Sequence, residues 1–377
     1  MVIAVNTRFL LQGRLEGIGW FTYETVKRMV QNHPEHQFVF LFDRPCAPEF
    51  IFGKNVTPVV VSPPARHPLL WWWFERSLPA VLQKVKADVF LSPDGYGSLR
   101  TEVPTVLVVH DLAFEHYPEH LAFWAKTFYR RYTPLYARKA RRLATVSDFS
   151  KADLIKQYGI TSDKIDVVYN GFNAAYRPLS EEEKNQVRAQ FTGGAEYLLF
   201  VGALHPRKNI ERLMLAFDLF KEKNPSSVKM LIVGRRAWHT SSMERTYRRL
   251  RHRDDVIFAG HRQIDVLPKL MGAALGLTYV SLFEGFGIPI IEAMQTDTPV
   301  ITSNVSSMPE VAGGAALLAD PFSTEQIAEA MTKLYTHKNL RQELIEKGRL
   351  QRQQFSWDAT AQRLWACFEK AVISSAP

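Results

Sequence analysis

Cysteine and long hydrophobic runs are scarce in this sequence. Its 377 residues include only two cysteines, Cys46 and Cys367, which lie far apart and belong to no CxxC pair or Cys/His cluster. This usage favours a reducing compartment and argues against a disulfide framework or a structural zinc site. No apolar run approaches the roughly 18–20 residues that span a bilayer. The start of the chain, Met1–Val5, lacks the basic and apolar regions of a signal peptide. We therefore expect a cytoplasmic protein.

The remaining composition is that of a soluble globular protein. Hydrophobic residues make up 46% of the chain, charged residues 23%, and the net charge is +9. A chain of this length suits two domains rather than one core. The segment Gly13–Gly19 reads GRLEGIG, which is not the GxGxxG fingerprint of dinucleotide-binding folds. The backbones of Gly17 and Gly19 are nevertheless expected to let a phosphate or an acceptor approach closely.

Apolar segments of strand length alternate with amphipathic stretches of helix length. The expected strands are 2–8, 38–42, 56–61, 89–92, 106–110, 143–146 and 165–169, then 197–201, 229–233, 256–259, 277–281, 299–302 and 316–318. Continuous apolar strands separated by helices predict parallel sheets covered on both faces, and right-handed crossovers give doubly wound α/β domains. The sequence thus predicts two Rossmann-like domains, 1–174 and 175–355, and a closing helix within 356–377.

The most informative motif lies at residues 281–294. Glu284 and Glu292 flank a glycine-rich bend, between an apolar strand and the opening of a helix. The bend consists of Gly285, Phe286, Gly287 and Ile288. Backbone N–H groups and the positive end of a helix dipole meet at such a junction, which makes it an anion site that phosphate usually occupies. The two acids would repel phosphate and suit sugar and ribose hydroxyls instead. Taken singly, Glu292 could merely complement the helix dipole and Glu284 could merely cap a loop.

Further polar residues follow other expected strands. Gly202 and the adjacent cations Arg207 and Lys208 come after strand 197–201, and His110 ends strand 106–110. Ligands of open α/β sheets bind at the carboxyl ends of the strands, where the strand order reverses. We expect Arg207 and Lys208 to neutralise a diphosphate there, although an Arg-Lys pair before a helix is often only a solvated surface feature.

Together these motifs resemble the retaining GT-B glycosyltransferases of family 4, whose glutamate-x7-glutamate motif corresponds to Glu284 and Glu292. The resemblance implies two Rossmann-like domains facing across a crevice, with the last helix crossing back onto the N-terminal domain. It implies that Arg207, Lys208 and the amides of the 285–288 bend hold the diphosphate of the donor. It also implies that Glu292 binds ribose and Glu284 the hexose 3- and 4-hydroxyls. The other implied contacts are His110 near the hexose 6-hydroxyl, the glycine loop of Gly17 and Gly19, Gly202, and a polar turn at Ser306 and Ser307.

The resemblance implies transfer of a hexose, with retention of configuration, from a nucleotide diphosphate sugar to a hydroxyl of a glycan or lipid-linked glycan. The opening Asn6–Phe9 and the segments 17–23 and 145–150 most resemble bacterial mannosyltransferases of polysaccharide and O-antigen assembly. GDP-mannose is therefore the favoured donor, and UDP-glucose or another UDP-hexose is the alternative. A GT-B nucleotide-sugar epimerase and a non-enzymatic partner protein are the competing functions. No cofactor is expected, and no metal, because the chain lacks the Asp-x-Asp element that holds one in GT-A transferases.

A basic segment from His120 to Ser147 contains seven cationic side chains and no acidic one, interleaved with aromatic residues. It looks like a basic amphipathic helix that could lie on an anionic membrane at the inner face. The alternative is a solvated face with an aromatic stripe in the core. We expect no nucleic-acid partner, because the chain carries no signature of a nucleic-acid-binding module.

Overall fold

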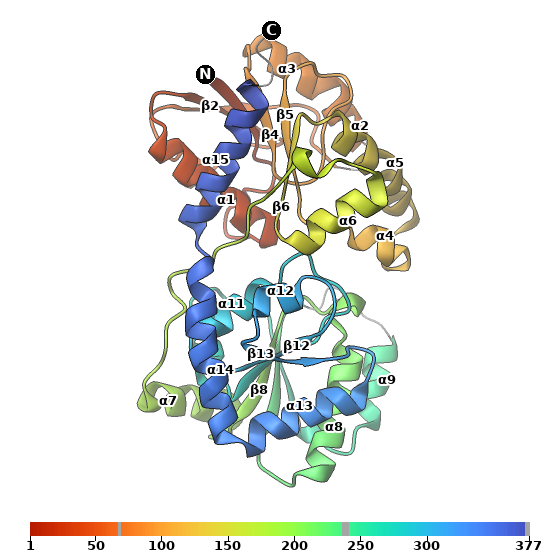
Figure 1. Cartoon of the computed structure of the whole chain (residues 1–377), viewed down its shortest axis with the longest axis vertical. Helices are drawn as coiled ribbons and strands as arrows, with labels where there is room; N and C mark the ends of the chain where they lie inside the picture. The colour runs from red at the N-terminus through yellow and green to blue at the C-terminus, as the bar shows by residue number, and fades with distance from the viewer. Residues whose placement is uncertain (67–68, 236–240, 374–377) are drawn as a thin grey trace. The chain divides into compact units, whose positions relative to one another are not determined.

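The computed structural model describes residues 1–66, 69–235 and 241–373. Within it the chain forms two compact units, one comprising Met1–Gly171 together with the C-terminal segment from Ser356, the other Phe172–Phe355 (Figure 1). The division after Gly171 lies three residues before the boundary expected at 174, and the C-terminal segment begins at the expected residue.

The first unit is built on a parallel sheet of seven strands. They are β1 (Val2–Asn6), β2 (Gln37–Phe42), β3 (Val56–Val60), β4 (Val89–Ser92), β5 (Thr105–Val109), β6 (Arg142–Thr145) and β7 (Ile165–Val167), in the order β3-β2-β1-β4-β5-β6-β7. Strands β4 and β5 are buried along their whole length, as their continuous apolar sequences predict.

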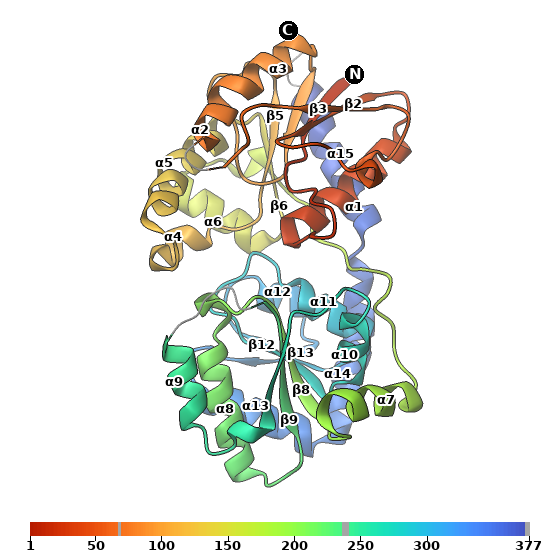
Figure 2. The same cartoon turned by 180° about the vertical axis from the view of Figure 1, so that it is seen from behind.

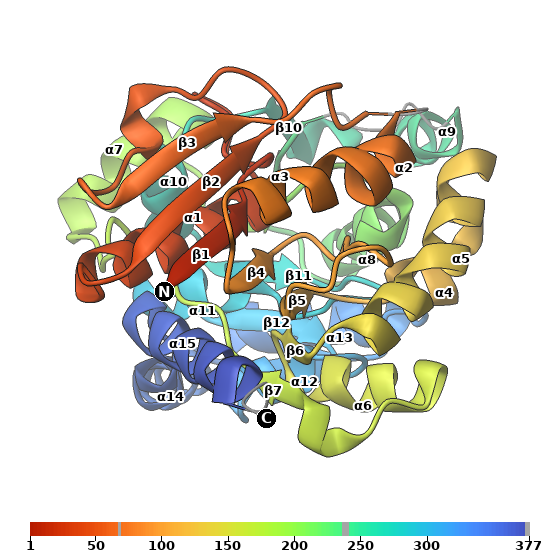
Figure 3. The same cartoon turned by 90° about the horizontal axis from the view of Figure 1, so that it is seen from above.

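Helices cover both faces of this sheet. The helices of the unit are α1 (Gly17–Asn32), α2 (Leu70–Trp72), α3 (Leu78–Lys84), α4 (Ala113–His116), α5 (Phe123–Lys139), α6 (Asp148–Tyr158) and α15 (Trp357–Ile373). Seen from above, α2 and α3 lie on one side of the sheet and α15 on the other (Figure 3). The basic segment 120–147 is not one helix, because α5 ends at Lys139 and the chain then enters β6.

The closing helix α15 packs beside α1 in the first unit (Figures 1 and 2). Its apolar stripe, which includes Leu364 and Phe368, is fully buried. The chain passes so close to Gly171 that a Cβ there would lie 2.3 Å from the Trp357 nitrogen, so only glycine fits. The expected return of the last helix to the N-terminal domain is confirmed.

The second unit is built on a parallel sheet of six strands. They are β8 (Tyr197–Val201), β9 (Lys229–Val233), β10 (Val256–Gly260), β11 (Gly276–Tyr279), β12 (Val300–Ser303) and β13 (Ala316–Ala319), in the order β10-β9-β8-β11-β12-β13. Its helices are α7 (Glu181–Thr192), α8 (Ile210–Lys223), α9 (Ser241–Arg249), α10 (Leu267–Ala273), α11 (Ile288–Gln295), α12 (Met308–Ala312), α13 (Thr324–Thr336) and α14 (Lys338–Gln351).

Both sheets reverse their strand order at one place. The reversal lies between β1 and β4 in the first unit and between β8 and β11 in the second. Each of the thirteen expected strand segments overlaps an observed strand, so the doubly wound fold class is confirmed. In this class of fold ligands bind beyond the carboxyl ends of the strands at the reversal. Functional side chains are therefore expected at the two strand reversals.

Candidate active site

The site of the second unit is built by the loops that follow β8 and β11, the strands on either side of the reversal. After β8, Pro206–Lys208 form one turn of 3₁₀-helix, and the His205 ring accepts a hydrogen bond from the Arg207 amide. Asn209 then adopts a left-handed conformation, with φ of 61°, and its amide group donates to the carbonyls of Val280 and Pro321. These contacts fix the direction of the Arg207 and Lys208 side chains before helix α8 begins.

Arg207 and Lys208 converge on the carboxylate of Glu284. The Arg207 guanidinium lies 2.9 Å from Oε2, and the Lys208 ammonium lies 2.5 Å from Oε1. Lys208 also donates to the Tyr279 hydroxyl at 2.6 Å. Only 8% of the Glu284 side chain is exposed, against 21% for Arg207 and 13% for Lys208. The three groups predicted from the sequence are therefore brought into direct contact.

The electrostatics of this cluster favour a negatively charged ligand. Burial by itself would raise the pKa of Glu284, but the charges of Arg207 and Lys208 outweigh it and hold that pKa at about 2. The carboxylate is therefore ionised at neutral pH, and two cations with one anion leave a net charge of +1. The carboxylate offers about four lone-pair sites, and Arg207 and Lys208 bond to one oxygen each.

The bend after Glu284 is held by a serine pair on the turn after β12. Ser306 Oγ accepts from the Glu284 amide at 3.1 Å, and the buried Ser307 hydroxyl lies 2.9 Å from the carbonyls of both Glu284 and Phe286. Gly287 has φ of 107°, which L-residues with a side chain rarely adopt, and it leads directly into α11 at Ile288. The polar turn thus fixes the bend, which places the expected donor-binding residues Gly285, Phe286, Gly287 and Ile288 at a helix N-terminus.

Glu292 lies one turn into α11, in a poorly solvated position. Burial raises its pKa to about 7, and a hydrogen bond with the Tyr176 hydroxyl opposes that rise only in part. Tyr176 is itself buried, and it stands in the segment that precedes α7. The two glutamates of the motif therefore differ in electrostatics, since Glu284 is ionised and Glu292 titrates near neutrality.

Gly202 lies at the carboxyl end of β8, where its backbone turns with φ of 153°. Its amide donates to the Val233 carbonyl at 3.0 Å, and its own carbonyl lies 1.8 Å from where a Cβ of Gly234 would be. The loops after β8 and β9 therefore pack backbone to backbone at this point. The close approach explains Gly234, and the positive φ explains Gly202.

His110 lies in the first unit, just beyond β5. Its Nε2 lies 2.8 Å from the Pro93 carbonyl, and its ring packs edge-to-face on Phe21 at 4.9 Å between centroids. Burial lowers the pKa of His110, although the Pro93 carbonyl and nearby acids oppose the shift. The neutral ring then carries its proton on Nε2, and Nδ1 can accept a hydrogen bond from a hydroxyl.

The glycine loop differs from the sequence expectation. We expected a helix from near Trp20, but α1 already begins at Gly17, so Gly17 and Gly19 belong to its first turn. A Cβ on Gly19 would lie 2.8 Å from the Phe9 carbonyl, whereas one on Gly17 would meet nothing within 4 Å. The missing side chain of Gly19 is explained by contact with the protein's own backbone. Open space for a ligand remains beside Gly17.

Several polar residues of the two sites were missed by sequence reasoning. At the reversal of the first sheet, Arg8 is ion-paired with the buried Asp94, which also accepts from the Asn6 amide at 2.8 Å. In the second unit, Tyr279 and Tyr176 contact Lys208 and Glu292. A tyrosine within an apolar strand hints at a buried hydroxyl that needs a partner. No spacing in the sequence, however, identifies that partner.

Helix α5 carries the predicted basic segment, and its aromatic residues divide into two groups. Tyr136 is buried and Phe128, Tyr129 and Tyr132 pack against the same core cluster. The Phe123 and Trp124 side chains at the start of the helix are instead 70% and 76% exposed. The expected aromatic core stripe therefore describes the later part of the helix. The exposed aromatic rings at its start fit the alternative of a membrane-binding helix.

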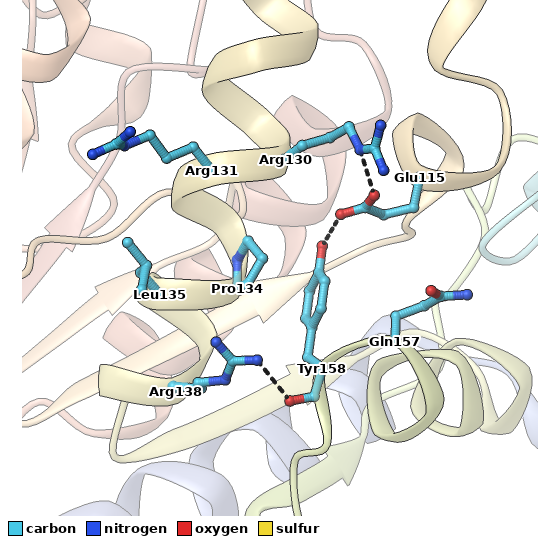
Figure 4. Close-up of a pocket in the computed structure, with 8 residues that line it drawn as sticks. All are labelled: Glu115, Arg130, Arg131, Pro134, Leu135, Arg138, Gln157 and Tyr158. Carbon is cyan, nitrogen blue, oxygen red and sulfur yellow. Dashed lines mark hydrogen bonds and ion pairs between the residues drawn. The ribbon is translucent and has the colours of Figure 1, made fainter.

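Beside α5 a hollow of about 420 Å³ is lined by arginines. Arg130 pairs with Glu115, which also accepts from the Tyr158 hydroxyl, and Arg138 donates to the Tyr158 carbonyl (Figure 4). Arg131 points away from Glu115 in the same view (Figure 4).

Through residues 1–66, 69–235 and 241–373, no helix combines the length and the apolar character needed to cross a bilayer.

Known glycosyltransferases are similar to this chain along most of its length. The model of the family described as "Glycosyl transferases group 1" matches residues 181–351, and that of "Glycosyltransferase Family 4" matches residues 15–176. An O-antigen chain mannosyltransferase of Escherichia coli is 29% identical over 74% of this chain and 73% of its own length. An O-antigen chain mannosyltransferase of Salmonella typhimurium is 32% identical over 57% of this chain and 56% of its own length.

The fold is shared with solved glycosyltransferase structures. Sucrose-phosphate synthase from Thermosynechococcus elongatus superimposes with a TM-score of 0.78 over 99% of this chain and 100% of its own, at 18% identity. A similarity at such low identity shows only that the GT-B fold is shared. The two family models together match most of the chain. The chain thus combines a Glycosyltransferase Family 4 domain at residues 15–176 with a glycosyl transferases group 1 domain at residues 181–351.

Proposed function

We propose that this glycosyltransferase transfers mannose from GDP-mannose, with retention of anomeric configuration, to a hydroxyl of a glycan or lipid-linked glycan. The observation that carries the proposal is the contact of Arg207 and Lys208 with Glu284 at the strand reversal of the second unit. Family membership favours a transferase over the epimerase. The names of the two O-antigen mannosyltransferases favour mannose over other hexoses.

In this proposal the donor diphosphate binds at the net positive cluster. Arg207 and Lys208 face the phosphate oxygens, and the amides of the 285–288 bend at the start of α11 add hydrogen-bond donors. Positive charge at this place stabilises the negative charge that grows on the diphosphate as the sugar departs. No metal ion is required for that role, because the two side chains supply the charge. Metal independence is therefore part of the proposal.

The two glutamates are assigned to hydroxyl groups. Glu292 would accept hydrogen bonds from ribose, and Glu284 would accept them from the hexose 3- and 4-hydroxyls through the lone pairs that Arg207 and Lys208 leave. Glu284 acts in addition as a positioning residue, since each of its oxygens holds one cation in place. His110 would accept from the hexose 6-hydroxyl through Nδ1, with its proton held by the Pro93 carbonyl.

The transfer step then proceeds on one face of the sugar. The bond between the anomeric carbon and the β-phosphate oxygen breaks, and its electron pair leaves with the diphosphate. The acceptor oxygen forms the new bond on the same face, and its proton passes to the departing phosphate oxygen. Catalysis rests on positioning and charge stabilisation, without a protein nucleophile. UDP-glucose or another UDP-hexose is the alternative donor.

We propose that the enzyme meets its acceptor at a membrane surface, which helix α5 contacts. Its exposed Phe123 and Trp124 offer apolar rings of the kind that sit at a bilayer interface, and Arg131 and Arg138 follow on the same helix. A lipid-linked glycan acceptor would then be met at the inner face by a peripheral enzyme. No nucleic-acid partner is part of the proposal.

The function is tested by turnover with defined donors. Purified protein is mixed with GDP-mannose, UDP-glucose or other UDP-hexoses, each with EDTA, and release of the nucleotide diphosphate is followed with lipid-linked or free glycan acceptors. We expect release from GDP-mannose only, and a product whose anomeric configuration by NMR matches the donor. An inverted product would overturn the mechanism, and selective turnover of a UDP-hexose would overturn the donor.

A further inference from the structure

We propose that the turn His33-Pro34-Glu35-His36 in the first unit binds one divalent transition-metal ion, zinc by preference, through His33, Glu35 and His36. These residues form a group whose ligand atoms all lie within 4.8 Å of one another. The turn joins the end of α1 to β2 and is separate in sequence from every residue assigned to donor binding. No motif along the chain indicates this site, because the cysteine spacings that usually indicate zinc are missing.

The backbone holds the three ligands close together before any ion binds. The His36 amide donates to the His33 carbonyl at 3.2 Å, which closes a four-residue turn. Pro34 occupies the second position of this turn, where its fixed φ favours the bend. The Asn55 side chain donates to the carbonyls of His36 at 3.0 Å and of His33 at 3.4 Å. The turn is thus tied from inside the unit, and little ordering is left for the ion to impose.

Two of the three distances between ligand atoms are close to those around a tetrahedral ion. With metal–ligand bonds of about 2.0–2.2 Å, two ligand atoms of a tetrahedral zinc site lie roughly 3.3–3.5 Å apart. His33 Nδ1 lies 3.6 Å from Glu35 Oε1, and His36 Nε2 lies 3.4 Å from the same oxygen. Two imidazoles and one carboxylate are a ligand set that zinc accepts, with a fourth position for water. Without an ion the same groups form only a solvent-exposed histidine–carboxylate pair.

The rings are also oriented by contacts outside the ligand set. Trp365 of α15 stacks on His33, with 3.5 Å between centroids and 11° between planes, and it also lies along His36. Fixed ring orientation is what outer contacts supply in known metal sites. Ion binding would therefore fasten the α1–β2 turn beside the closing helix.

The test is zinc titration by calorimetry of the full chain, prepared without a polyhistidine tag and stripped with a chelator. We expect one saturable equivalent of zinc, and visible absorption typical of tetrahedral coordination when Co²⁺ replaces it. His36→Gln and Glu35→Gln should each weaken zinc binding at least about tenfold. Glu35 is exposed, so its replacement leaves the fold intact. His337→Gln, a surface histidine of the second unit, is the matched control and should change nothing.

Two results would overturn the site. One is the lack of a saturable equivalent in the wild-type protein, which would leave the turn as an ordinary histidine–carboxylate pair. The other is zinc binding that Glu35→Gln and His36→Gln leave unchanged, which would place the ion elsewhere. Glycosyl transfer is not used as a readout, so failure here is independent of the proposed function.

Discussion

The ammonium group of Lys208 lies 2.5 Å from one carboxylate oxygen of Glu284, and the guanidinium of Arg207 lies 2.9 Å from the other. One acid thus fixes two neighbouring cations at the strand reversal of the second sheet. The arrangement leaves a net positive site in which neither cation is free to swing into solvent.

Replacing Lys208 with alanine should slow transfer without unfolding the protein. The ammonium group is proposed to stabilise charge that appears on the departing diphosphate, so its loss should cost at least about 3 kcal/mol, roughly 150-fold in kcat/KM. Initial rates at varied donor concentration measure the effect. Lys347→Ala, on the surface of α14, serves as the control. Near-normal turnover of Lys208→Ala would show that Lys208 does not stabilise the departing diphosphate.

Replacing Glu284 with glutamine should change how stability depends on pH. The folded pKa of about 2 lies below the ordinary value of about 4.3. The ion pairs therefore contribute stability above pH 4.3 and lose it as pH falls toward 2. That contribution is about 3 kcal/mol. Glutamine cannot titrate, so urea unfolding should find the variant less stable at pH 7 and the difference shrinking between about pH 5 and 2.

A surface acid of helix α13 provides the comparison for this experiment. Glu329→Gln should track the wild-type protein at every pH. A gap between wild type and Glu284→Gln that stays constant from pH 7 to pH 2 would show that the carboxylate does not titrate as proposed.

Glu292 should impose a pH dependence on donor binding. Its pKa is raised to about 7 by burial, so it is largely protonated at pH 6 and ionised at pH 8. Only the ionised form accepts hydrogen bonds with both oxygens, and GDP-mannose affinity should therefore rise as pH increases through 7. Calorimetry at pH 6, 7 and 8 measures it, with Glu292→Gln expected to be flat. An affinity that rises equally in the variant would assign the titration to another group.

The same substitution should alter stability in the opposite sense to Glu284→Gln. A raised folded pKa means that the Glu292 contribution is greatest below about pH 4.3 and falls as pH rises through 7. Glu292→Gln should therefore gain stability relative to wild type between pH 5 and pH 8, by up to about 3 kcal/mol. Thermal unfolding of both proteins at pH 5 and pH 8 measures this gain. A difference in stability between variant and wild type that is the same at both pH values would show that the Glu292 carboxyl does not have a raised pKa.

Ser307 should act through the bend that it holds. Its hydroxyl lies 2.9 Å from the carbonyls of Glu284 and Phe286, so Ser307→Ala leaves both without that donor. We expect a loss of about 1–3 kcal/mol in unfolding free energy and a fall in kcat/KM larger than the fall in folded fraction explains. Thr336→Ala removes an exposed hydroxyl of α13 that lies 2.7 Å from the Thr332 carbonyl and 2.8 Å from His337 Nδ1, and it should leave kcat/KM unchanged. A Ser307→Ala enzyme with normal kcat/KM would show that catalysis does not depend on the way Ser307 holds the bend.

Helix α5 should bind anionic membranes. Reversing the charge of Arg130, Arg131, Arg138 and Lys139 should abolish sedimentation with phosphatidylglycerol vesicles, since each cation near such a surface contributes about 1 kcal/mol. Phe123→Ser with Trp124→Ser should weaken binding through loss of the exposed rings. Charge reversal at Arg248 and Arg251 of the second unit is the control. Unchanged vesicle binding by the α5 variants would exclude this surface.

The sequence was sufficient for the fold because its signal is local. Runs such as Val106–Val109 are apolar throughout, and a parallel strand buried on both faces requires just that pattern. Helix starts were less certain. The α1 helix begins at Gly17 rather than near Trp20, because glycine does not prevent a first turn and Gly19 fits where a Cβ would meet the Phe9 carbonyl.

The residues of the site were predictable only where their chemistry is visible along the chain. Arg207, Lys208 and Glu284 stand next to strand ends, which sequence periodicity locates. Tyr279 and Tyr176 were missed, because a tyrosine among apolar residues looks like core until its hydroxyl finds a partner. The Arg8–Asp94 pair was missed for a different reason, since its members lie 86 positions apart. Pairing across a sheet depends on register, which single positions do not reveal.

We propose that Arg207 and Lys208 hold the diphosphate of a GDP-linked hexose. Calorimetric measurement of GDP and UDP binding in EDTA, to wild type and to Arg207→Ala/Lys208→Ala, tests this assignment. Wild type should bind GDP in preference to UDP without metal, and the double variant should lose at least a hundredfold in GDP affinity while remaining folded. Equal GDP binding by wild type and the folded double variant would contradict it.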